Sequence, residues 1–134
     1  MSFIKLKTLL FESSAEQKLN ALPKGQLFND AKSIKNTFDL SPYTWSQTIE
    51  AFEKNATKAK HVSIPIDSIK ITQPNIQLHK VLNIMANLDK TPIINAVKFD
   101  NDTIAIFDGH HRLMANWALG NSSIKVNLVD LTKL

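Results

Sequence analysis

The spacing of the apolar residues changes near residue 60, and this change limits what the chain can fold into. After it, apolar side chains alternate at Val62, Ile64 and Ile66, the two-residue period of a half-buried strand. Residues 93–99 and 103–107 are also β-rich and flank an Asp-Asn-Asp turn, which predicts a hairpin. Apolar residues at helical spacing predict helices at 78–88 and 110–119, and alternation returns at 124–129. The predicted order is β-α-β-β-α-β, an α+β domain with a small mixed sheet.

Residues 1–60 predict a helical N-terminal extension to a domain at 61–134. Ser13 and Glu16 have capping-box spacing, and Ser41-Pro42 is typical of a helix start. The apolar faces expected for the second and third helices are Leu27, Phe28, Ala31, Ile34 and Phe38, and Trp45, Ile49, Phe52 and Ala56. Amphipathic faces usually form to bury apolar surface, so we expect these helices to pack on a neighbour.

Composition excludes several classes of protein. The chain has no cysteine, which excludes a disulfide scaffold, a thiolate zinc site and a cysteine nucleophile. No apolar run approaches the roughly 20 residues of a membrane-spanning helix. Lys5 and Lys7 interrupt the apolar start, so no signal peptide is predicted and a cytoplasmic protein is expected. The net charge of +4 permits phosphate binding and predicts that any DNA binding is weak.

The segment from Asp108 to Ala115 carries the strongest chemical signal. A predicted strand runs into Asp108-Gly109, and a predicted helix begins directly afterwards. Free backbone N–H groups at a helix N-terminus favour an anion, and Gly109 lets that anion approach the backbone. His111 and Arg112 add donors in the first turn. Arg112 is the only arginine among sixteen basic residues, and its planar fork can hold two phosphate oxygens.

Asp108 admits several roles beside a bound phosphate. It can cap the helix, orient the imidazole of His110, or hold a divalent cation that bridges to phosphate. The simplest alternative is an ordinary capped helix start with exposed histidines. A zinc site would have to draw on Asp108, His110 and His111 with His61 or His79. Adjacent helical side chains point about 100° apart, which argues against that site.

A second polar stripe is predicted on the preceding helix. Lys80, Asn83 and Asn87 lie at positions i, i+3 and i+7, opposite the apolar face. Lys80 near the helix start is a candidate phosphate ligand. The alternative is an ordinary solvated helix face.

From about residue 61 to 131 the chain resembles the ParB/sulfiredoxin superfamily. The resemblance rests on Ile64-Pro65-Ile66, the helix of Lys80, Pro92-Ile93 and the signature at 108–115. It implies a ParB/sulfiredoxin-like fold and a nucleotide site in which His111 and Arg112 hold phosphates. It also implies nucleotide contacts by Lys80, Asn83 and Asn87. His110 stands where sulfiredoxins have their catalytic cysteine, so sulfinic-acid reduction is excluded.

Two branches of the superfamily are similar in the signature. The free-serine kinases share the string Asp-Gly-His-His-Arg, but Gln73 stands where they have a glutamate base. An amide cannot accept a proton from a substrate hydroxyl, so serine kinase activity would need Asp67 or Asp108 instead. The partition proteins of the superfamily bind CTP at a Gly-Glu-Arg-Arg turn in the corresponding place.

The resemblance implies a protein that binds ATP or CTP, with Mg²⁺ as a further cofactor. Gly109, His111, Arg112 and Lys80 would bind phosphates, and Asp108 and His110 would be the catalytic residues of a phosphotransferase, NTPase or nuclease. Asp108 would also be the metal ligand. The alternative is a non-catalytic DNA- or protein-binding module with a vestigial nucleotide cleft, such as a phage or plasmid accessory protein. A homodimer is a further expectation.

Overall fold

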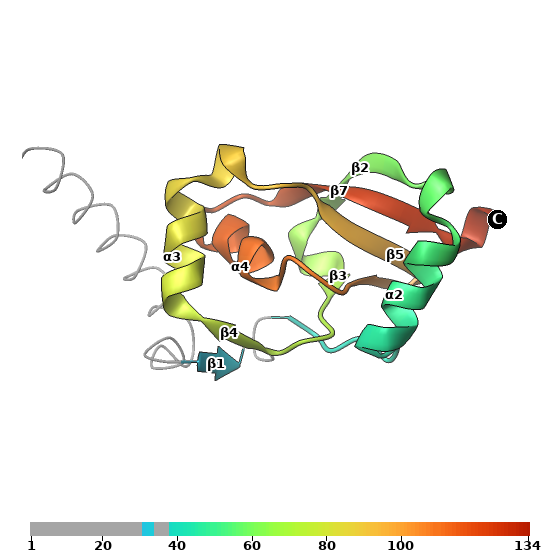
Figure 1. The fold of residues 1–134 in the computed structure, drawn as a ribbon, viewed down its shortest axis with the longest axis horizontal. Coiled ribbons are helices and arrows are strands. Elements are labelled where there is room, and N and C mark those ends of the chain that lie inside the picture. The colour runs from blue at the N-terminus through green and yellow to red at the C-terminus, as the bar shows by residue number, and fades with distance from the viewer. Residues whose placement is uncertain (1–30, 34–37) are drawn as a thin grey trace, which may run out of the picture.

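The computed structural model describes residues 31–33 and 38–134 of the 134-residue chain. These residues form an α+β protein whose elements are arranged as Figure 1 shows. The helices are α2 (Trp45–Lys54), α3 (Leu78–Ala86) and α4 (His110–Ala118). The strands are β1 (Ala31–Ser33), β2 (Lys60–Pro65), β3 (Ile69–Lys70), β4 (Asn75–Gln77), β5 (Ile94–Asp100), β6 (Thr103–Ile106) and β7 (Ser123–Asp130).

Five of the strands form one mixed sheet in the order β2-β7-β5-β6-β3. The β2–β7 and β5–β6 pairs are antiparallel, while β5–β7 and β3–β6 are parallel. A bridge between Leu40 and Ile71 continues the sheet beyond β3. A separate antiparallel ribbon joins β1 to β4, directly before α3. In the chain, α3 lies between β4 and β5, and α4 lies between β6 and β7.

The two faces of the sheet bury different residues because side chains alternate along each strand. One face carries Ile94, Ala96 and Val126, which pack with Leu113 and Met114 of α4 in the main core. The other face carries a row of small buried residues, Val97, Ala105 and Val129, which lie side by side on neighbouring strands. The helix α2 contacts β5 and β6 and covers that row.

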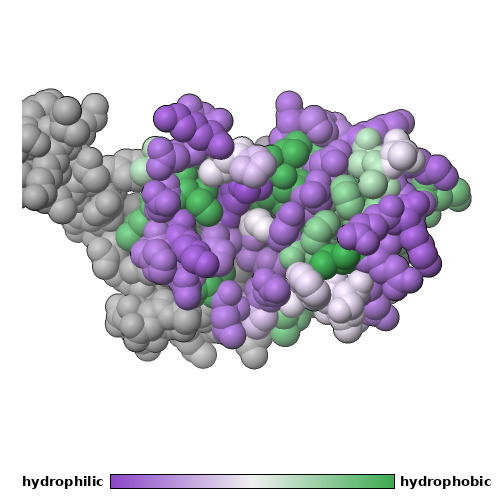
Figure 2. Space-filling model, viewed as in Figure 1, coloured by the Kyte–Doolittle hydropathy of each residue, from purple (hydrophilic) through white to green (hydrophobic). Residues whose placement is uncertain are grey.

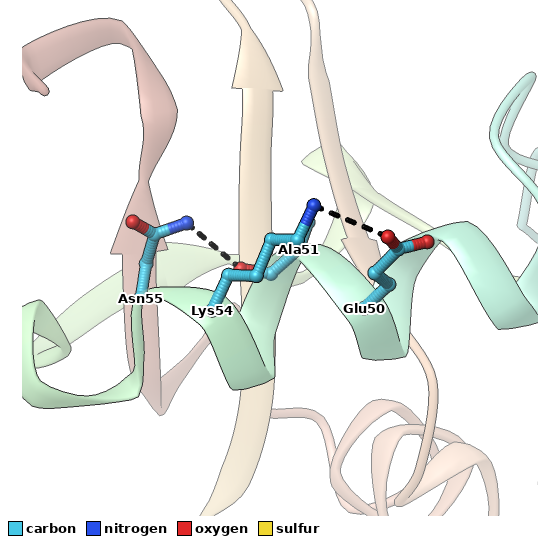
Figure 3. Close-up of polar contacts among 4 residues, drawn as sticks. All are labelled: Glu50, Ala51, Lys54 and Asn55. Atoms are coloured by element: carbon cyan, nitrogen blue, oxygen red, sulfur yellow. Dashed lines mark hydrogen bonds and ion pairs between the residues drawn. The ribbon is translucent and has the colours of Figure 1, made fainter.

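The helix α2 begins at a complete capping box. The Thr44 hydroxyl accepts from Gln47 N–H at 3.1 Å, and Gln47 Oε1 accepts from Thr44 N–H at 2.8 Å. The outer face of α2 carries an ion pair between Glu50 and Lys54 at 3.2 Å, and the Asn55 amide donates to the Ala51 carbonyl at the other end (Figure 3).

The predicted α+β class and the predicted elements after residue 60 are confirmed. The two helices, the β5–β6 hairpin and the terminal strand lie within two residues of their expected bounds. The structure adds β3 and β4, two strands of two and three residues that were too short to leave a period in the sequence. The division of the chain at residue 60 stays a prediction.

Three expectations for the N-terminal part are corrected. The third helix begins after Thr44, not at Ser41-Pro42, because Ser41 Oγ accepts from Tyr43 N–H in a tight turn. The expected inward face is also wrong at Trp45, which is 44% exposed, whereas Thr48 is fully buried. Residues 31–33 form β1, not part of a helix, because β4 offers them an unpaired strand edge. The helix expected after Ser13 lies outside the described residues.

The face of the molecule drawn in Figure 2 is largely hydrophilic, with small hydrophobic patches between the hydrophilic side chains. Within residues 31–33 and 38–134, no helix combines the length and the apolar character needed to cross a membrane.

Candidate functional site

The turn between β6 and α4 requires glycine at position 109. Gly109 is the N-cap of α4 and has φ = 73°, a left-handed conformation that side chains disfavour. An ideal Cβ at this position would lie 2.8 Å from Cγ1 of Ile94, which is fully buried and has no room to move. Gly109 also has no side chain to cap α4. Glycine is therefore required here by the backbone conformation and by the packing of Ile94.

His110 is buried and ties the turn to the loop after β3. Its Nε2 accepts from the backbone N–H groups of Thr72 at 3.1 Å and Gln73 at 3.2 Å. Burial, with a smaller contribution from the charge of His111, lowers the pKa of His110 to about 4. The imidazole is therefore neutral at pH 7, with its proton on Nδ1. Because Nε2 is already occupied by two donors, this geometry favours a structural role over the catalytic one that the sequence suggested.

His111 connects α4 to the start of α3. Its Nε2 accepts from Gln77 N–H at 3.1 Å, so the neutral ring carries its proton on Nδ1. Burial, followed by the nearby charges of Lys80 and His79, lowers the pKa of His111. His111 can therefore offer an Nδ1–H donor to a ligand but has no second nitrogen with which to act as a base.

The side chain of Arg112 has no ion-pair partner, and its Nε no hydrogen-bond partner, among the described residues. This Nε is buried. No carboxylate of that part of the chain lies within 4 Å of it, since the one ion pair found there joins Glu50 and Lys54. Burial lowers the pKa of Arg112, and the charge of Asp108 partly opposes this. The guanidinium nevertheless stays protonated at any ordinary pH. A half-buried cation with an unpaired donor is a binding position for an anion.

Asp108 precedes Gly109 and is exposed. Partial desolvation raises the pKa of its carboxyl, against the opposing effects of the Asn95 backbone N–H and the Arg112 charge. Among the side chains of residues 108–112 it is the one with lone pairs left for a proton or a cation, since both histidines use Nε2 and Arg112 has only donors. No three metal-binding side chains cluster in the described part of the chain, so the zinc alternative has no support. Mg²⁺ fits better, because phosphate-bound Mg²⁺ needs only one or two carboxylates.

The structure brings Lys80 to the turn but not the rest of its stripe. Lys80 lies in the first turn of α3, close enough for its charge to affect His111. Asn83 and Asn87 follow about 5 and 10 Å further along the helix axis. The amide of Asn87, the C-cap of α3, donates to the Asn83 carbonyl at 3.0 Å. The predicted nucleotide contacts of these two asparagines stay predictions.

Two features of the site were missed in the sequence. Nothing near Thr72 and Gln73 indicated that their backbone would hold His110. Trp45 was assigned to a buried face, yet its indole Nε1 donates to the carbonyl of Phe107 at 2.8 Å, at the edge of the turn. The sequence held one signal for this contact of Trp45. Trp45 is the first residue of a helix, and a side chain at that position can project past the helix end.

Comparisons with known proteins add a structural likeness. No protein-family model matches the chain, and a search of curated proteins found no match. The crystal structure of sulfiredoxin from Arabidopsis thaliana is similar over 53% of this chain and 85% of that chain, with 22% sequence identity and a TM-score of 0.46.

Proposed function

We propose that this protein binds a nucleoside triphosphate, ATP or CTP, with its phosphates at the turn between β6 and α4. The observation that carries the proposal is the Nε of Arg112, which is buried and has no hydrogen-bond partner in the described part of the chain. A buried donor without a partner typically destabilises a fold by about 1–3 kcal/mol, and a phosphate oxygen would remove that penalty. Phosphate also suits the planar fork of arginine better than a single carboxylate oxygen or a chloride.

The neighbouring groups complete an anion-binding arrangement. The first N–H groups of α4 and the Nδ1–H of His111 are donors, and Lys80 supplies a second positive charge. Gly109 itself contributes no side-chain cap that would compete for these N–H groups. His110 acts as a positioning residue that holds the loop at Thr72 and Gln73 against the turn. Asp108 would hold a phosphate-bound Mg²⁺ ion, which would neutralise phosphate charge.

Binding is better supported than catalysis. Phosphoryl transfer or hydrolysis needs a group that orients or deprotonates the nucleophile. Both histidines use Nε2 to accept from the backbone, which leaves Asp108 as the one candidate base of the turn. This occupation of the imidazoles favours the second candidate function, a DNA- or protein-binding module whose turn holds a nucleotide without turning it over.

Isothermal titration with ATP, CTP and inorganic tripolyphosphate, each with and without Mg²⁺, tests the proposal. Arg112→Ala should weaken binding of all three by roughly 10- to 100-fold, since a charge-assisted hydrogen bond is worth about 1.5–3 kcal/mol. Arg112→Lys should restore little of this loss, because a point charge does not replace the fork. Lys125→Ala removes the same charge from an exposed position on β7 and is the matched control. Unchanged affinity in Arg112→Ala would contradict the proposal.

The same preparations separate binding from turnover. Release of phosphate from ATP or CTP that disappears in Asp108→Asn would indicate an enzyme. Tight nucleotide binding without phosphate release, together with weak and salt-sensitive DNA binding, would indicate the binding module.

A further inference from the structure

Trp45 presents an exposed indole beside the turn. Its side chain is 44% exposed, although it is one of the largest apolar groups in the protein. The hydrogen bond from Nε1 to the Phe107 carbonyl places one edge of the ring two residues before Gly109. Two residues of chain span at most about 7 Å, so the indole lies within reach of a small ligand held at the start of α4.

Neighbouring contacts fix both partners of that hydrogen bond, Trp45 and Phe107. Trp45 is the first residue of α2, directly after the capping box of Thr44 and Gln47. The ring of Phe52, also on α2, packs on the ring of Phe107 with centroids 5.5 Å apart and a tilt of 56°. Figure 1 shows the turn running between α4 on one side and α2 on the other. A fixed and partly bare aromatic surface therefore stands on the α2 side of the turn.

We propose that Trp45 stacks on the base of the nucleotide whose phosphates bind at Gly109–Arg112, an inference that rests on the proposed function. The residues at the start of α4 are donors and cations, and none of them recognises a base. Stacking on an indole needs no matching hydrogen-bond pattern, because every base has a π-face. A purine covers more of an indole than a pyrimidine does, so the site should prefer ATP to CTP.

Substitutions at Trp45 separate stacking from a merely structural contact. Trp45→Phe keeps an aromatic face but loses the N–H that bonds to Phe107, whereas Trp45→Leu loses both. We expect Trp45→Leu to weaken ATP binding roughly 10- to 100-fold while tripolyphosphate binding, which involves no base, changes less than twofold. Trp45→Phe should retain most of the ATP affinity. In a Trp117→Phe background, where Trp45 is the only tryptophan, ATP should quench the emission and tripolyphosphate should not.

The remaining outcomes each count against one of the two proposals. An equal loss of ATP and tripolyphosphate in Trp45→Leu would mean that Trp45 only supports the turn, and would overturn the stacking. Arg112-dependent binding of both probes with no effect of Trp45→Leu would also overturn the stacking while leaving the phosphate site intact. If neither probe binds the unmodified protein, both proposals fall.

Discussion

The N-terminus of α2 and that of α4 are built in different ways. At α2, Thr44 and Gln47 pair reciprocally with each other's backbone N–H groups. At α4, Gly109 contributes no side-chain cap, and the Nε of Arg112 in the first turn has no hydrogen-bond partner among the described residues. The end of α4, which no side chain caps, is where we propose that the phosphates bind. The comparison can be tested at both ends.

The largest effect is expected from Gly109→Ala. A left-handed backbone is unfavourable by about 1–2 kcal/mol for other residues, and the clash with Ile94 adds overpacking of similar size. We expect a loss of roughly 3 kcal/mol in the free energy of unfolding by urea, together with loss of tripolyphosphate binding. Gly120→Ala is the control, since Gly120 has a φ of 87° at the other end of α4. Equal losses of unfolding free energy in the two variants would show that the Ile94 side chain can move to accept the added methyl group.

Acidification should weaken the fold through His110. Its folded pKa of about 4 lies below the usual histidine pKa of 6.5, so the unfolded chain takes up the proton first as the pH falls. The contribution of His110 is complete above pH 6.5 and is lost as the pH falls toward 4. Between pH 7.5 and pH 5 we expect a loss of about 2 kcal/mol in denaturant unfolding.

The control for this pH dependence is His110→Gln, whose Oε1 can accept from the Thr72 and Gln73 N–H groups without titrating. This variant should lose most of the pH dependence between 7.5 and 5. If the unmodified protein and His110→Gln lose the same stability between pH 7.5 and pH 5, groups other than His110 cause the pH dependence.

Removing the cap of α2 should have a smaller effect, confined to stability. Thr44→Ala deletes the hydroxyl that accepts from Gln47 N–H, and such caps are worth about 1 kcal/mol. Tripolyphosphate affinity should be unchanged, because the cap lies outside the phosphate turn. A parallel loss of affinity would show that the two helix ends are coupled through the turn.

The smallest effect is expected on the outer face of α2. Glu50 and Lys54 are about two-thirds exposed, so their ion pair is screened by water and salt (Figure 3). Lys54→Ala should change the unfolding free energy by less than about 0.5 kcal/mol, and 1 M salt should remove even that difference. A loss above 1 kcal/mol would require a contact of the lysine stem with the pocket beside Tyr43 and Phe99.

Most elements after residue 60 were predictable because they bury one face with a clear period. The exceptions are β3 and β4, which are too short, and β2, in which only Ile64 is buried and Val62 of the expected inward face is exposed. The strand–turn–helix at Asp108–Gly109 was also predictable, since glycine and the change of period mark it. The difference between His110 and His111 was not, because it depends on backbone N–H groups more than thirty residues earlier in the chain. Trp45 was misplaced because helical spacing assumes that a helix buries one straight stripe, whereas α2 buries Thr48 and lets its first residue reach past its end.

The proposed phosphate ligand is the Nε of Arg112, which has no partner within residues 31–33 and 38–134. Because Arg112 is the only arginine, the protein should give a single arginine Nε–H cross-peak in a ¹⁵N–¹H correlation spectrum. On titration with tripolyphosphate, that peak should move together with the backbone amides of residues 109–112, and the amides of α2 should stay in place. A stationary Nε–H peak while other amides move, or no movement anywhere, would contradict the account.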